Sequence, residues 1–86
     1  MSKYVVERTF PQPLNVSPDL GKVVKQAYDD NGVEWLFSFL SSDKQKSYCV
    51  FESPSAEAIR ETSQQLNLPV DSIVELGGEL RPEMFA

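Results

Sequence analysis

The stretch Lys46–Glu52, with the sequence Lys-Ser-Tyr-Cys-Val-Phe-Glu, has the composition of a β-strand, because aromatic and β-branched residues dominate its centre. It also carries Cys49, the one cysteine of a chain of 86 residues that contains no histidine. The polar residues 42–45 precede it, and before them Val33–Ser41 is again rich in large apolar residues. Two such strands separated by a short polar turn predict a β-hairpin.

A helix is predicted on each side of this hairpin. Before it, Ser17-Pro18 places a capping serine ahead of a proline at the first helical position. Asn31-Gly32 then ends this helix, because both residues tolerate left-handed backbone geometry. After the hairpin, Ser53-Pro54-Ser55 opens a second helix, in which either serine is a candidate cap, and Asn67-Leu68-Pro69 ends it.

One further strand is predicted near each end of the chain, at Lys3–Phe10 and at Asp71–Leu76. A short tail, Leu80–Ala86, follows Gly77-Gly78. The order β-α-β-β-α-β predicts a single ferredoxin-like α+β domain over residues 1–86. That fold has a four-stranded antiparallel sheet in the order 4-1-3-2, with both helices on one face. Because the other face stays bare and a domain of this size is marginally stable alone, we expect a homodimer.

The charge balance argues against two classes of partner. The chain has 13 acidic and 8 basic residues, a formal net charge of −5, and its basic residues are scattered. Nucleic acids and anionic membranes attract clustered lysine and arginine, so we expect neither as a partner. No apolar run reaches the ~20 residues that span a bilayer. A single cysteine cannot form an internal disulfide, which favours a reducing cytoplasm.

Alternation divides each strand between two faces of the sheet. One face is mainly apolar, and we assign it to the helices; it collects Tyr4, Val6, Phe10, Trp35, Phe37, Phe39, Tyr48, Val50, Val74 and Leu76. Arg8 falls on this face near a strand end and is expected to form a salt bridge. The other face is mixed, and we assign it to a cleft or a dimer interface; it collects Val5, Glu7, Thr9, Leu36, Ser38, Leu40, Ser47, Cys49, Phe51, Ile73 and Glu75.

The strand order predicts a polar row, Glu75–Glu7–Cys49–Ser38, across the mixed face, because neighbouring strands lie ~4.8 Å apart. A partly buried glutamate needs a partner, which is either an ordinary polar group or a ligand. A thiolate beside carboxylates binds divalent transition metals, so Cys49 and Glu7 are the candidate ligands of nickel or zinc, and a dimer would supply a second Cys49. Alternatively, burial beside Glu75 makes Glu7 a general base for cofactor-independent chemistry on a small organic molecule.

Several of these residues belong to a spaced pattern that covers nearly the whole chain. It comprises Tyr4–Pro11 (Tyr-Val-Val-Glu-Arg-Thr-Phe-Pro), Trp35-x-x-Ser38, Lys46-x-x-Cys49-x-x-Glu52-x-Pro54, Glu57-Ala58-Ile59-Arg60, and Leu68-Pro69 followed by Ile73-Val74-Glu75. The pattern resembles the small bacterial domain-of-unknown-function family 4242, whose members are often labelled nickel-binding. The resemblance implies a ferredoxin-like fold, a dimer and nickel binding, and it places emphasis on Glu7, Ser38 and Cys49.

The sequence therefore favours a cytoplasmic homodimer that acts as a small binding protein, with nickel or another divalent metal as its ligand. Two alternatives remain open. One is a cofactor-independent enzyme with a cleft on the open sheet face and Glu7 as its base. The other is a structural or regulatory dimer without a ligand, in which the polar row is satisfied internally. We expect a binding protein rather than an enzyme.

Overall fold

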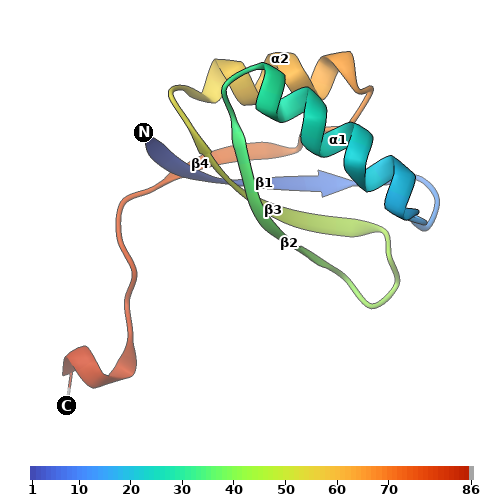
Figure 1. The fold of residues 1–86 in the computed structure, drawn as a ribbon. Helices are drawn as coiled ribbons and strands as arrows, with labels where there is room; N and C mark the ends of the chain where they lie inside the picture. Colours follow the sequence, from blue (N-terminus) through green and yellow to red (C-terminus); the bar gives the residue numbers. More distant parts are fainter. Residues whose placement is uncertain (86) are drawn as a thin grey trace.

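The computed structural model describes residues 1–85 and places two helices on one face of a four-stranded antiparallel sheet (Figure 1). The elements are β1 (Ser2–Thr9), α1 (Pro18–Asp30), β2 (Glu34–Leu40), β3 (Lys46–Ser53), α2 (Ala56–Gln65) and β4 (Ser72–Leu76). The strand order β2-β3-β1-β4 is the predicted order 4-1-3-2 counted from the other edge, so the ferredoxin-like fold is confirmed.

Both helices begin at serine caps. A backbone N–H of the first turn donates to Ser17 Oγ (3.1 Å) in α1 and to Ser55 Oγ (3.2 Å) in α2, which identifies Ser55 rather than Ser53 as the second cap. Gly32 and Asn67, which follow the two helices, adopt positive φ angles of 73° and 56°. No helix within residues 1–85 has both the length and the apolar character needed to cross a bilayer.

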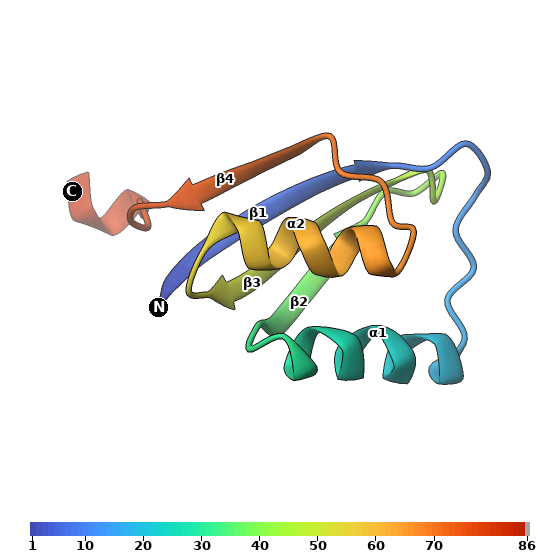
Figure 2. The same ribbon diagram turned by 90° about the horizontal axis from the view of Figure 1, so that it is seen from above.

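The chain leaves the sheet after β4. A 3₁₀ helix, η1 (Pro82–Phe85), projects from the rest of the molecule on an extended segment (Figures 1 and 2). Its side chains Met84 and Phe85 are exposed, as is Leu80 before it. Ala86, the end of the predicted tail, lies outside the described residues.

Strand pairing decides which side chains face the helices, because residues directly opposite each other in antiparallel strands share a face. Tyr4 lies opposite Phe51, and Val6 lies opposite Cys49; all four side chains are buried in the core between sheet and helices. Tyr48 consequently lies on the open face. The prediction that Tyr48 faces the helices and Cys49 faces away from them is therefore wrong.

β2 and β4 also differ from the prediction. A bulge between Trp35 and Phe37 leaves Trp35 packed against the core and turns Phe37 and Phe39 to the open face. In β4, Ile73 packs against the core while Val74 is half exposed on the open face. Both faces carry apolar side chains, so alternation within one strand does not reveal which of its faces is buried. β1 alone keeps the predicted orientation.

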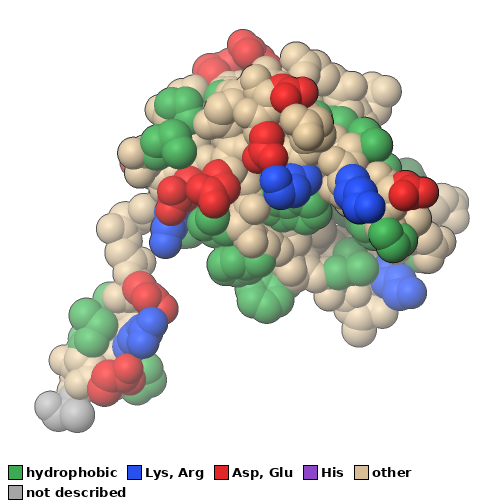
Figure 3. All heavy atoms as spheres, in the orientation of Figure 1, with side chains coloured by type: hydrophobic (Ala, Val, Ile, Leu, Met, Phe, Trp, Pro, Cys, Tyr) green, Lys and Arg blue, Asp and Glu red, His purple; other side chains and the backbone are tan. Residues whose placement is uncertain are grey.

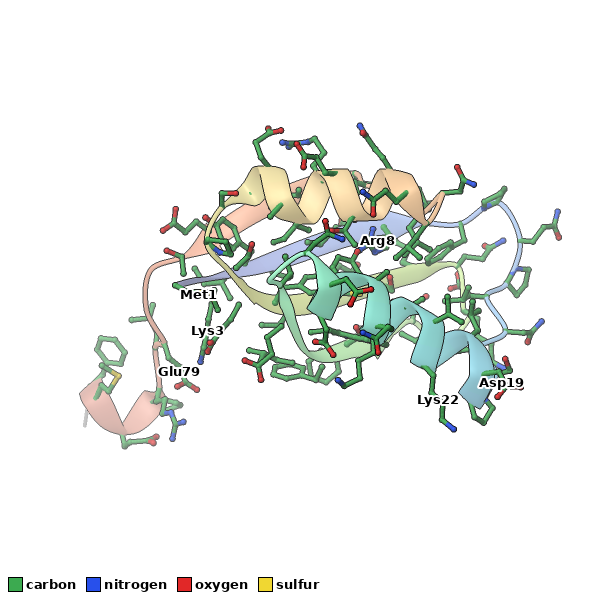
Figure 4. All side chains as sticks on the ribbon, turned by 45° about the horizontal axis from the view of Figure 1, so that its top comes forward. Met1, Lys3, Arg8, Asp19, Lys22 and Glu79 are labelled. Atoms are coloured by element: carbon green, nitrogen blue, oxygen red, sulfur yellow. The ribbon has the colours of Figure 1, made fainter. Side chains whose placement is uncertain are left out.

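Arg8 holds both helices to the sheet. Its side chain is 2% exposed and lies beneath the helices (Figure 4). Nη2 donates to Tyr28 Oη of α1 (2.7 Å), while Nη1 donates to Ser63 Oγ of α2 (3.3 Å) and to the carbonyl of Pro69 (3.0 Å). No carboxylate within residues 1–85 lies within ion-pair distance of Arg8, so the predicted salt bridge is wrong.

The hydroxyl groups around Arg8 form a directed chain. Ser63 Oγ donates its one proton to the carbonyl of Ile59 (2.8 Å), so Tyr28 donates to Ser63 across their 2.8 Å contact. A buried guanidinium is costly unless its N–H groups find acceptors. Hydrogen bonds to a charged group contribute roughly 1.5–3 kcal/mol each, so this network links α1, α2 and β1 firmly.

We expect Tyr28→Phe to lower the free energy of unfolding by roughly 1.5–3 kcal/mol, because it removes an acceptor from a buried charged group. Urea denaturation followed by far-UV circular dichroism, at one fixed protein concentration, measures the change. Tyr48→Phe is the matched control: it removes a hydroxyl from the open face and should change the free energy by less than about 0.5 kcal/mol. Equal effects of the two variants would contradict the role assigned to the network.

Candidate functional site: the cavity beneath α1

A partly open cavity of about 210 Å³ lies between the sheet and the N-terminal half of α1. The connector from β1 to α1, the first turns of α1, the outer ends of β2 and β3, and the loop after α2 all contribute to its wall. Its apolar lining consists of Phe10, Leu14, Val16, Leu20, Gly21, Val24, Phe39, Leu40, Leu66 and Leu68. With Arg8 of β1, the cavity therefore forms where residues from the β1–α1 region, the β2–β3 hairpin and the loop after α2 meet.

Few polar groups reach this cavity. They belong to Arg8, Trp35, Ser38, Ser47 and Cys49. The Cys49 side chain is 8% exposed, and its Sγ lies 3.8 Å from Ser47 Oγ. Trp35 Nε1 donates to Ser38 Oγ (2.8 Å). The cavity is thus largely apolar and contains one cationic side chain and one thiol.

The bulge in β2 positions two of these groups. Strict alternation would place Trp35 and Ser38, three positions apart, on opposite faces of the sheet. The extra residue at the bulge brings both side chains to the helix side, where they are hydrogen-bonded. Ser38 also lies opposite Cys49 in β3. Ser38 and Cys49 are the two members of the predicted polar row that the structure brings together.

The remainder of the predicted row is not formed. Glu7 lies opposite Tyr48 and occupies the open face, whereas Cys49 lies opposite Val6 on the helix side. The predicted position of Cys49 beside Glu7 is wrong because a one-residue change in pairing moves a side chain to the other face. Glu75 is exposed on the edge strand β4 and pairs with neither of them.

Glu7 and Cys49 cannot contact the same metal ion within one copy, because the sheet separates them. Within residues 1–85, no three cysteine, aspartate or glutamate side chains lie close enough together to hold a metal ion. Glu7 Oε1 instead lies 3.5 Å from Lys46 Nζ.

The cleft proposed for enzymatic use of Glu7 coincides with neither of two hollows formed by the described residues. Glu7 is absent from the wall of the 210 Å³ cavity. It is also absent from the wall of a wider hollow of about 780 Å³, which Lys3, Phe37 and Leu76 help to line at the far end of the open face. Neither of these two hollows adjoins Glu7, so neither would hold a substrate beside a general base at position 7.

The sequence analysis did not assign two components to the cavity, Arg8 and the connector before α1. For Arg8 a signal exists: it continues the inward alternation of Tyr4 and Val6 along β1, so a buried position could have been predicted. The connector that contributes Leu14 has no periodicity, so its packing over the sheet is not predictable from pattern.

Two groups have shifted pKa values, and both lie on the surface away from the cavity. A hydrogen bond to Asp29, together with the charge of Asp29, raises the pKa of Lys25. Hydrogen bonds from Ser41 and from the backbone of Gln45 lower the pKa of Asp43 in the turn between β2 and β3. Neither group contributes to the chemistry of the cavity.

Two solved structures share this fold. The crystal structure of SCO4226 from Streptomyces coelicolor A3(2) matches 92% of this chain and 100% of its own, with a TM-score of 0.71 and 19% sequence identity. The NMR structure of the heavy metal binding protein TM0320 from Thermotoga maritima matches 86% of this chain and 98% of its own, with a TM-score of 0.53 and 19% identity. No curated protein matches the sequence significantly.

The sequence itself matches a family profile, described as nickel responsive protein SCO4226-like, over residues 4–76. This range includes both helices and nearly all of the sheet, and it ends before the projecting segment that carries η1. The chain belongs to the nickel responsive protein SCO4226-like family.

Proposed function

We propose that this protein is a homodimeric binding protein whose ligand is nickel or another divalent metal, with donors supplied by both copies. The match of residues 4–76 to a nickel-responsive family is the observation that carries this proposal. The name of the Thermotoga maritima neighbour, a heavy metal binding protein, points in the same direction.

The donor groups of a single copy are not sufficient for a metal site. The sequence has no histidine and one thiol, and the described residues form no cluster of three donors. Cys49 lies in a mainly apolar cavity with cationic Arg8 in the same wall, which is an unfavourable setting for a metal cation. Donors from a second copy are therefore part of the proposal.

The open face of the sheet is the surface proposed for dimerisation. Its exposed apolar side chains are Phe37, Phe39, Tyr48, Val74 and Leu76, with exposed fractions between 37% and 67%. Hydrophobic side chains are visible on the side of the molecule away from the helices (Figure 3). A contiguous apolar patch of this kind marks an interaction site in a small soluble domain.

A second copy of the same face is the occupant that we propose for it. Glu7 lies 3.5 Å from Lys46, and Lys3 lies opposite Glu52, so both lysines of this face have a glutamate beside or opposite them within one copy. Glu34, which also lies opposite Glu52, adds a third acid, so the net charge of the face is small. A two-fold interface brings identical patches together, and a patch with little net charge repels its own copy only weakly.

Glu7 is the metal donor that we propose. Its side chain is 33% exposed, and it projects from a central strand on the face that would meet a second Glu7 in a two-fold dimer. Carboxylate oxygens are suitable ligands for divalent cations. The two Cys49 thiols, in contrast, would lie behind their respective sheets and stay apart.

Isothermal titration calorimetry with nickel chloride and zinc chloride tests the metal proposal. We expect Glu7→Gln to weaken binding at least about tenfold, because each copy loses a charged donor. Cys49→Ala and Glu83→Gln, which change a cavity thiol and a tail carboxylate, should leave the affinity unchanged. Absence of binding heat for either metal at micromolar concentrations would contradict metal binding, and selective loss in Cys49→Ala would contradict Glu7 as the donor.

Light scattering coupled to size-exclusion chromatography tests the dimer. We expect a mass of about twice the 9.7 kDa of one chain for the wild type. Phe39→Glu should shift the protein to the monomer, because it buries a charge in an apolar interface. Val23→Glu, a similar change at an exposed position of α1, should leave the dimer intact. A monomeric wild type at micromolar concentration would refute the interface.

A further inference from the structure

Among residues 1–85, Arg8 is the one charged side chain in the wall of the 210 Å³ cavity, and no acid of that range lies within ion-pair distance of it. Its three hydrogen-bond acceptors are a phenol, an alcohol and a backbone carbonyl, all of them neutral. The lining contains no aspartate or glutamate. Asp19, the acidic residue in the first turn of α1, lies at the outer end of that helix and does not line the cavity (Figure 4).

The surroundings of Arg8 differ from those of the four cations that form ion pairs. Lys25, Lys46, Arg60 and Arg81 each lie within 4.0 Å of a carboxylate, and their side chains are 41–66% exposed. Arg8 is buried, so water screens its charge far less. Although the protein has a net charge of −5, Arg8 places a positive charge in the wall of this cavity, and no acidic side chain among the described residues lines it.

We propose that the cavity binds a small organic carboxylate with an apolar body, whose charged end faces Arg8. The nearly continuous apolar wall suits a hydrocarbon body, and Arg8 together with the hydroxyl of Ser47 suits a carboxylate. A cavity of roughly 150 Å³ accommodates benzene, so a volume of about 210 Å³ suits a body of about six to eight carbons.

The polarity of the wall selects this class over other ligands. Phosphate or sulfate would lose more hydration than the few donors of the cavity replace. A cation would meet the charge of Arg8. The site is therefore separate from the proposed metal site at Glu7, which lies on the opposite face, and it does not depend on that proposal.

Trp35, the only tryptophan of the chain, lines the cavity and provides the readout. Its fluorescence is followed while sodium octanoate, 1-octanol, octylammonium chloride or inorganic phosphate is added to the full-length protein. We expect saturable octanoate binding that is at least about tenfold tighter than that of 1-octanol, with no saturable response to the cation or to phosphate. Equal affinities for the three octyl compounds, or tighter binding of phosphate, would overturn the proposal.

Gly21→Leu tests the location without altering Arg8. A side chain at Gly21 would meet no atom within 4 Å of its Cβ, so leucine has room to occupy the cavity, and it is also a better helix former than glycine. We expect octanoate affinity to fall at least about tenfold while thermal stability is kept. Gly78→Leu, the same change outside the cavity, should not alter binding. Unchanged octanoate affinity in Gly21→Leu would overturn the assignment to this cavity.

Arg8→Met tests the charge. We expect octanoate affinity to fall to that of 1-octanol, with the affinity for 1-octanol itself unchanged. Retention of the octanoate preference in a folded Arg8→Met protein would overturn the role of Arg8. If that variant does not fold, the preference of the wild type for octanoate over 1-octanol and octylammonium, together with its loss in Gly21→Leu, decides the proposal.

Discussion

The buried guanidinium of Arg8 is the interaction on which the arrangement of this domain depends. It extends from a central strand and reaches α1 through Tyr28, α2 through Ser63 and the segment before β4 through Pro69. A cation in this position requires all of these acceptors, because it is almost fully buried and no acid within residues 1–85 accompanies it. One side chain therefore sets where the two helices lie on the sheet, and with them the roof of the cavity.

The sheet separates two kinds of surface. Its helix side holds the core and a small cavity with cationic Arg8 in its wall, whereas its open side combines exposed aromatic residues with the Glu7–Lys46 ion pair. Cys49 and Glu7, close in the predicted sheet, belong to different sides, so their chemistry is independent. The metal proposal rests on Glu7 of the open face and the organic carboxylate proposal on Arg8 of the helix side, so the two proposals concern different faces.

Membership of a nickel-responsive family does not by itself identify donors in this chain. Metal sites need several donors converging within about 2–3 Å of one point. The described residues of one copy offer no such group. Glu7 is accessible on the open face and would meet its counterpart in a two-fold dimer. The family match and the geometry are compatible when the binding unit is larger than one chain.

Much of the fold could be predicted because its signals are local. Ser17-Pro18 begins α1, Asn31-Gly32 ends it, and the polar turn at 42–45 joins β2 to β3. The site could not be predicted to the same extent. Its residues were recognised in part, since Ser38 and Cys49 both line the cavity, but their neighbours were misassigned. The sequence predicts an ion-paired Arg8, and the connector containing Leu14 carries no periodic pattern that places it over the sheet.

The sequence by itself determined the order of helices and strands and the Ser17 cap of α1, because capping, turn and alternation signals act within a few residues. Only the tertiary structure decided which face of β3 is buried, where the bulge in β2 turns Phe37 outward, and that the hydrogen-bond acceptors of Arg8 are neutral groups. These features depend on strand register and on contacts between segments far apart in the chain. Both faces of each strand carry apolar residues, so local pattern leaves that register undetermined.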